Sequence, residues 1–154
     1  MIQRIQTVYL FIAAVLVAVA NFFPLAHCYV GQGFYTITAM GVEASGVPEF
    51  AGSGVWMLCA SGAWAASLAL ILYAIFAYKD RIKQMKTCVY AILAILVFYV
   101  LFGVEVWTVN SETGVFPDLG IIAELPLIAL ILIFLAGRAI KRDEDMVRAA
   151  DRIR

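Results

Sequence analysis

The fold of this chain is decided by residues 79–107, which read KDRIKQMKTCVYAILAILVFYVLFGVEVW. The first eight residues are mostly charged or polar, whereas residues 87–107 contain a single charged residue, Glu105. The core of a bilayer needs about 20 mainly apolar residues per helix, and a backbone in lipid must satisfy its own hydrogen bonds. Residues 87–107 therefore predict a membrane-spanning helix that begins directly after a charged turn.

Three more apolar stretches of similar length occur at residues 5–23, 55–78 and 119–136. Apolar residues make up 64% of the chain, charged residues only 14%, and the mean hydropathy is +0.95. Soluble domains contain about 25% charged residues. The composition therefore argues against a soluble enzyme and against a nucleic-acid partner, and it predicts an integral membrane protein whose solvent is the lipid bilayer.

The connections between these stretches set the predicted topology. Residues 79–86 allow only a short turn, so the second and third spans are expected to be antiparallel neighbours. We therefore predict an all-α integral membrane fold, a four-helix up-and-down bundle that forms one domain over residues 1–154. Residues 25–54 are expected as a long outer loop. Residues 137–154 are expected as a cytoplasmic helical tail, because their charges and apolar residues recur at helical spacing.

The outer loop contains one local signal for β structure. Residues 34–40 read FYTITAM, and their side chains alternate in the manner of a strand. We expect a short β hairpin in which this strand pairs with residues 42–44. An isolated hairpin is only marginally stable in water, so it would need to lie on the outer end of the bundle or on a partner protein.

Lysine and arginine are retained on the cytoplasmic side of a membrane. The N-terminus, the 79–86 turn and the tail hold all eleven basic residues and five acidic ones, a balance of +6, and the other side has six acidic residues, a balance of −6. We therefore expect a multi-pass protein of a bacterial inner membrane with both termini in the cytoplasm. The outer acids permit two interpretations: a surface that attracts cations or a basic partner, or acids that no rule excludes from that side. They are Glu43, Glu49, Glu105, Glu112, Asp118 and Glu124.

Two carboxylates lie at or near membrane depth, where ionisable groups are costly and are functional candidates by default. Glu105 lies 19 residues after Lys86, about 28 Å along a helix, and Glu124 lies 14 residues before Arg138, about 21 Å. With His27, these carboxylates could converge at the outer end of the bundle and bind an ion or relay protons. Alternatively, all three are interfacial residues that contact water.

No spaced motif supports a stronger statement about chemistry. The sequence contains no nucleotide-binding loop, nucleophile elbow or zinc motif, so no catalytic, cofactor or metal site is predicted. Cys28 and Cys59 both lie towards the outer side, and whether they form a disulfide is left open. In the tail, Arg142, Arg148 and Arg152 are candidates for contact with anionic lipid or with a protein partner, and a solvated, salt-bridged extension is the alternative.

The two ends of the chain carry a resemblance to a known family. The start, MIQRIQTVYL, and the end, RAIKRDEDMVRAADRIR, resemble the bacterial membrane family catalogued as domain of unknown function 4293, found mainly in Bacteroidota. The resemblance implies an inner-membrane protein of four helices and carries no activity, substrate or catalytic residue. It also implies that a role shared by the family would lie with Gln3, Arg4, Gln6 and the charges of the tail.

The function that we expect is that of an accessory or scaffold subunit without enzymatic activity. It would contact a membrane or cytoplasmic protein partner through the tail and the outer loop. The alternative is a small transporter or an ion- or proton-conducting element that uses Glu124 and Glu105. A membrane enzyme comes third, and it would require a pocket that joins Glu124 to His27 or to another acid.

Overall fold

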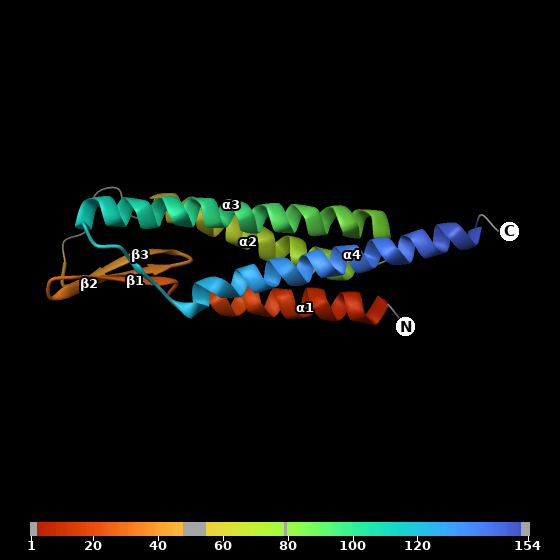
Figure 1. The fold of residues 1–154 in the computed structure, drawn as a ribbon, viewed down its shortest axis with the longest axis horizontal. Coiled ribbons are helices and arrows are strands. Elements are labelled where there is room, and N and C mark those ends of the chain that lie inside the picture. The colour runs from red at the N-terminus through yellow and green to blue at the C-terminus, as the bar shows by residue number, and fades with distance from the viewer. Residues whose placement is uncertain (1–2, 48–54, 79, 152–154) are drawn as a thin grey trace.

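A computed structural model describes residues 3–47, 55–78 and 80–151, in which helices lie side by side along the long axis and a β sheet covers one end (Figure 1). The helices are α1 (Gln3–Ala20), α2 (Val55–Phe76), α3 (Arg81–Thr113) and α4 (Leu125–Asp151), with a short 3-10 helix η1 (Ile121–Glu124) before α4. The strands are β1 (Ala26–Val30), β2 (Gly33–Thr38), β3 (Gly41–Ser45) and β4 (Asp118–Leu119). We call the end with the sheet the sheet end. The opposite end, which holds the start of α1, the α2–α3 turn and the last turns of α4, is the charged end.

The helices pack through stripes of buried residues that repeat every three and four positions. In α3 the stripe contains Cys88, Ala91, Ile95, Phe98 and Phe102, and in α4 it contains Ala129, Ile133, Ala136 and Ile140. This spacing averages 3.5 residues, the repeat of helices that pack at a small crossing angle. α2 packs most closely on α3, and α1 most closely on α4. Because many stripe residues are alanines, the helix backbones can approach one another closely.

Within the described residues, three helices are long and apolar enough to cross a membrane: Val55–Phe76, Arg81–Thr113 and Ile121–Val147. Only 28% to 33% of each apolar segment is buried in the protein, so most of its apolar surface faces outwards. Such a surface is suited to lipid and not to water. By these properties the protein is membrane-associated.

The expectation of four such spans is not met in the part of the chain that the structure describes. α1 contains a shorter apolar segment, Ile5–Ala20, and the helix ends before Asn21 and Pro24, whereas the predicted span continued to Phe23. Proline lacks the backbone N–H that would extend a helix, which accounts for a helix end in this region.

The prediction of an all-α bundle is wrong, because the described residues contain a four-stranded antiparallel sheet with the order β3-β2-β1-β4. The hairpin expected from residues 34–44 is present as β2 and β3, with Ile37 opposite Val42. The residues expected as loop before it form β1. β1 was not predicted because it is only five residues long, although it pairs with the adjacent β2, and β4 was not predicted because it has two residues and lies about 90 positions away from β1.

The start of the fourth predicted span is also corrected. Residues 118–119 form β4, with Leu119 paired to Ala26, and the Gly120 N–H donates to the Leu25 carbonyl at 2.9 Å. α4 begins only at Leu125, beside Pro126, a residue that is tolerated in the first turn of a helix. From there α4 continues to Asp151 without a break and includes the described part of the stretch that was predicted as a helical tail.

The sheet packs against the helices through its inner face. Ala26, Cys28, Tyr35 and Ile37 alternate with exposed or half-buried neighbours and are buried. The Cys28 thiol donates to the Val115 carbonyl at 3.5 Å, just beyond the end of α3. All three cysteines are free thiols, and Cys59 is exposed.

The first prediction concerns Gly33 in β2. A Cβ atom at this position would lie 2.5 Å from the Ser45 carbonyl oxygen and 2.7 Å from the Gly46 carbonyl carbon, both of which are backbone atoms. We expect Gly33→Ala to lower the stability of the purified protein in detergent by about 1–3 kcal/mol, measured by thermal unfolding. The matched control is Gly41→Ala, since no atom lies within 4 Å of a Cβ there. Equal unfolding temperatures for the two variants would contradict the close packing of β2 on β3.

Candidate functional site

The structure places the three predicted outer-site residues in three different environments. Glu105 is fully buried on the inner stripe of α3, Glu124 is exposed at the end of η1, and His27 is half-buried on β1. The Tyr99 hydroxyl donates to the Ala123 carbonyl at 2.6 Å, which places the residue before Glu124 beside Tyr99. Glu105 is six residues farther along α3, about 9 Å. The two carboxylates therefore differ in both depth and exposure.

His27 belongs to a polar row that crosses the outer face of the sheet. His27 is opposite Thr36 on one side and Asp118 on the other, and Thr36 is opposite Glu43. Next to this row, the Tyr29 ring lies 6.2 Å from the His27 ring and 6.1 Å from the Phe34 ring, measured between centroids. Within the described residues, no group of three or more His, Cys, Asp or Glu side chains could hold a metal ion.

Another polar group lies at the charged end, where its hydrogen bonds connect residues of four helices. The Gln6 side-chain amide of α1 donates to the Asp143 carboxylate of α4, and both residues are buried, with exposed fractions of 4% and 7%. The Arg81 guanidinium of α3 donates to the Asp143 backbone carbonyl at 3.3 Å. The Gln84 amide, also buried, donates to the Ala74 carbonyl of α2 at 2.9 Å. We call Gln6, Arg81, Gln84 and Asp143 the Asp143 cluster.

A buried carboxylate is costly unless it is well hydrogen-bonded. The Oδ2 atom of Asp143 accepts from Gln6, whereas Oδ1 is buried and has no hydrogen-bond partner among the described residues. Most buried polar atoms in proteins have a hydrogen-bond partner, so the Oδ1 atom of Asp143 can accept a further hydrogen bond. The cluster is therefore a polar site with capacity for one more contact.

A cavity of about 420 Å³ adjoins this cluster between α1 and the α2–α3 turn. Gln6, Arg81 and Gln84 of the cluster are part of its wall. The remaining wall residues are Thr7, Val8, Phe11 and Tyr78. The cavity therefore has polar groups on one side and aromatic and aliphatic groups on the other, as small-molecule sites often do.

Asp80 fixes the start of α3 and thereby positions Arg81 and Gln84. Its carboxylate accepts from the Lys83 backbone N–H at 3.2 Å and pairs with the Lys83 ammonium at 3.0 Å. The side-chain hydrogen bond from Lys83, aided by the backbone one, holds the pKa of the Asp80 carboxyl below its ordinary value. Asp80 is thus an ionised N-cap, the arrangement that favours the first turn of a helix.

A comparison with known families matches residues 2–153 to the family described as Domain of unknown function (DUF4293). The chain belongs to this family. The match covers almost the whole chain and confirms the resemblance that its two ends carry. A comparison with curated proteins finds no match. In this member of the family, the structure brings the two end motifs into contact, because Gln6 lies in the first and Asp143 in the second.

Among the charges of the tail, Asp143 has a position in the sequence that indicates burial. Asp143 follows Ala129, Ile133, Ala136 and Ile140 at spacings of four, three, four and three, and it therefore continues the buried stripe of α4. In α1, Gln6 precedes Leu10, Ala13, Val17 and Ala20 in the same way. A polar residue in register with an apolar stripe is expected to face the other helices. If the spacing of the buried positions in α1 and α4 is continued beyond the apolar segments, it leads to Gln6 and Asp143.

The three arginines of the tail that were predicted to contact lipid or a partner do not belong to the Asp143 cluster. Arg142, next to Asp143, is exposed, and Arg148 lies farther along α4. Arg152 lies outside the described residues.

The second prediction tests the Gln6–Asp143 contact. Gln6→Leu removes a donor from a buried carboxylate and should lower stability by about 1–3 kcal/mol. The double variant Gln6→Leu with Asp143→Leu should recover part of this loss, since both partners are then apolar and the Arg81 bond goes to the backbone. Thermal unfolding of the wild type, both single variants and the double variant in detergent gives the coupling energy. Additive effects of the two substitutions would contradict a direct contact.

Proposed function

We propose that this protein is an accessory or scaffold subunit of the bacterial inner membrane that contacts a protein partner and is not an enzyme. The observation that carries the proposal is the length of α4. This helix runs from Leu125 to Asp151, and its last turns project beyond α1 and the α2–α3 turn (Figure 1). A helix that continues out of the membrane offers a rigid surface to another protein.

The proposed orientation places the charged end in the cytoplasm and the sheet end outside. Both ends of the described chain lie at the charged end (Figure 1), together with the described parts of the basic segments. The sheet end carries Glu43, Asp118 and Glu124, and Glu49 lies outside the described residues. Because Lys and Arg are retained in the cytoplasm, this distribution supports cytoplasmic termini.

The projecting part of α4 has the surface that a partner would need. Met146 and Val147 are 45% and 44% exposed, and charged residues flank them. Large apolar side chains on a helix outside the bilayer are suited to bury against a second protein. The Asp143 cluster holds the base of this segment to α1 and α3, so the segment would be presented in a defined direction. The outer face of the sheet, with Tyr29 and Phe34, supports a second contact on the other side.

The third prediction tests the partner surface. A photoreactive amino acid at Met146 or Val147 should give a discrete protein adduct in native membranes, identified by mass spectrometry. The control position is Val100 of α3, which is 67% exposed at the middle of an apolar span and should give lipid adducts only. Lipid adducts alone at all three positions would overturn the proposal.

Ion or proton conduction remains a second candidate function, favoured by the complete burial of Glu105 within a spanning helix. Its proposed partner, Glu124, is exposed.

The fourth prediction separates the two candidates. Under the scaffold proposal, liposomes that contain the protein should dissipate a pH gradient no faster than protein-free liposomes, as followed with an internal pH-sensitive dye. A faster dissipation that Glu105→Gln abolishes, while Glu112→Gln leaves it unchanged, would favour conduction and count against the scaffold proposal. Glu112 is the matched control because it is exposed near the end of the same helix.

A further inference from the structure

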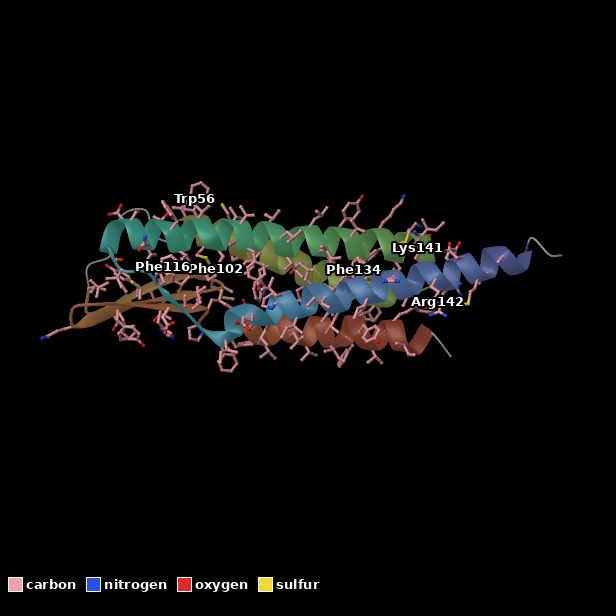
Figure 2. All side chains as sticks on the ribbon, in the orientation of Figure 1. Trp56, Phe102, Phe116, Phe134, Lys141 and Arg142 are labelled. Atoms are coloured by element: carbon pink, nitrogen blue, oxygen red, sulfur yellow. The ribbon has the colours of Figure 1, made fainter. Side chains whose placement is uncertain are left out.

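Two adjoining cavities lie along α4 at the charged end: one of about 320 Å³ between α3 and α4, and one of about 630 Å³ that is lined by residues of α4 alone. We call the two together the groove. Arg138 and Lys141 line both cavities and thus connect them. Figure 2 shows Phe134, Lys141 and Arg142 following one another along this part of α4. The groove therefore passes from an apolar part within the membrane span to a basic part beyond it.

The smaller cavity is apolar along most of its length. Val89 and Ile92 of α3 face Ile133 and Phe134 of α4 across it. Gly137 contributes no side chain, and a Cβ atom there would contact only the Cβ of Cys88, at 3.7 Å. An open apolar groove at hydrocarbon depth is suited to an acyl chain, since water has no polar partners there.

The larger cavity is basic. Arg138, Lys141 and Arg142 line it together with one acid, Asp145, which leaves an excess of two positive charges. Arg138 is one helix turn beyond Phe134, and Arg142 is one turn farther, with about 5.4 Å per turn. The headgroup layer on each side of a bilayer is about 5–7 Å thick, so an acyl chain beside Phe134 would carry its phosphate to the level of Arg138 and Lys141.

We propose that this groove is a binding site for an anionic glycerophospholipid. One acyl chain lies between α3 and α4, the phosphate binds Arg138 and Lys141, and further negative charge in the headgroup faces Arg142. Basic pockets between membrane helices on the cytoplasmic side bind anionic headgroups in this manner. A zwitterionic lipid leaves the excess positive charge uncompensated and binds more weakly. This site requires only that the helices lie in a membrane. Met146, a residue of the proposed partner surface, also lines the larger cavity, but the phosphate is assigned to Arg138 and Lys141.

The fifth prediction is a test by native mass spectrometry of the purified protein in detergent, titrated with phosphatidylglycerol or with phosphatidylcholine. One phosphatidylglycerol molecule should bind at least about tenfold more tightly than phosphatidylcholine. The double variant Arg138→Gln with Lys141→Gln should bind it at least about tenfold more weakly than the wild type. Both side chains are exposed, so this variant is expected to fold.

Two controls separate a defined site from general attraction. Lys86→Gln removes an exposed positive charge at the same end, outside the groove, and should leave phosphatidylglycerol binding within about twofold. Gly137→Leu fills the apolar part and should weaken binding with all basic residues in place. Inorganic phosphate should not compete at equal concentration, because it lacks an acyl chain.

Three results would overturn the proposal. They are equal binding of the two lipids, an equal loss for Lys86→Gln and for the Arg138 and Lys141 variant, and displacement of the lipid by inorganic phosphate.

Discussion

The structure depends on the packing of the buried stripe of α3, which runs from Gln84 to Val109 at spacings of four and three. α2 packs along this stripe, with Trp64 edge-on to Phe98 at 4.5 Å between ring centroids, and α4 packs beside it. Lipid surrounds the apolar helices as readily as another helix would, so the hydrophobic effect does little to hold them together. Close contact therefore has to come from shape, which small residues such as Ala60, Ala91 and Ala129 provide.

The ends of the helices add polar contacts that the apolar stripes cannot supply. At the charged end, Gln6, Gln84 and Asp143 occupy stripe positions, so their polar groups face one another and the neighbouring backbones. Hydrogen bonds are directional, which makes them suited to define how the helices align along their length. At the sheet end the alignment comes from backbone pairing, because Gly120 and Leu119 bond to the segment that follows α1. The direction of the α4 projection and the shape of the α3–α4 groove both follow from these contacts.

The helices were predictable because hydropathy is a local property, and the hairpin of β2 and β3 because its alternation and its turn lie within thirteen residues. β4 was not predictable in this way, since Leu119 meets Ala26 only after α2 and α3 have folded between them. β1 pairs with the adjacent β2, and its five residues carry too short a pattern to be recognised. For the predicted ion or proton site, Glu105 and Glu124 were selected only by their expected depth in the membrane. Depth does not give the rotational position of a residue on its helix, and this position separates the buried Glu105 from the exposed Glu124 and brings Asp143 inward.

Composition, apolar length and the clustering of Lys and Arg thus establish from the chain itself that this is a membrane-associated protein with one basic and one acidic end. Composition, the length of an apolar stretch and the clustering of charges are properties of the sequence itself, so they do not depend on how the chain folds. The tertiary structure alone decides that the end motifs of the family meet through Gln6 and Asp143 and that a sheet covers the acidic end. It also decides that Arg138 and Lys141 lie at the edge of an apolar cavity between α3 and α4. These features are contacts between residues far apart in the chain, and they exist only once several helices are packed in one register.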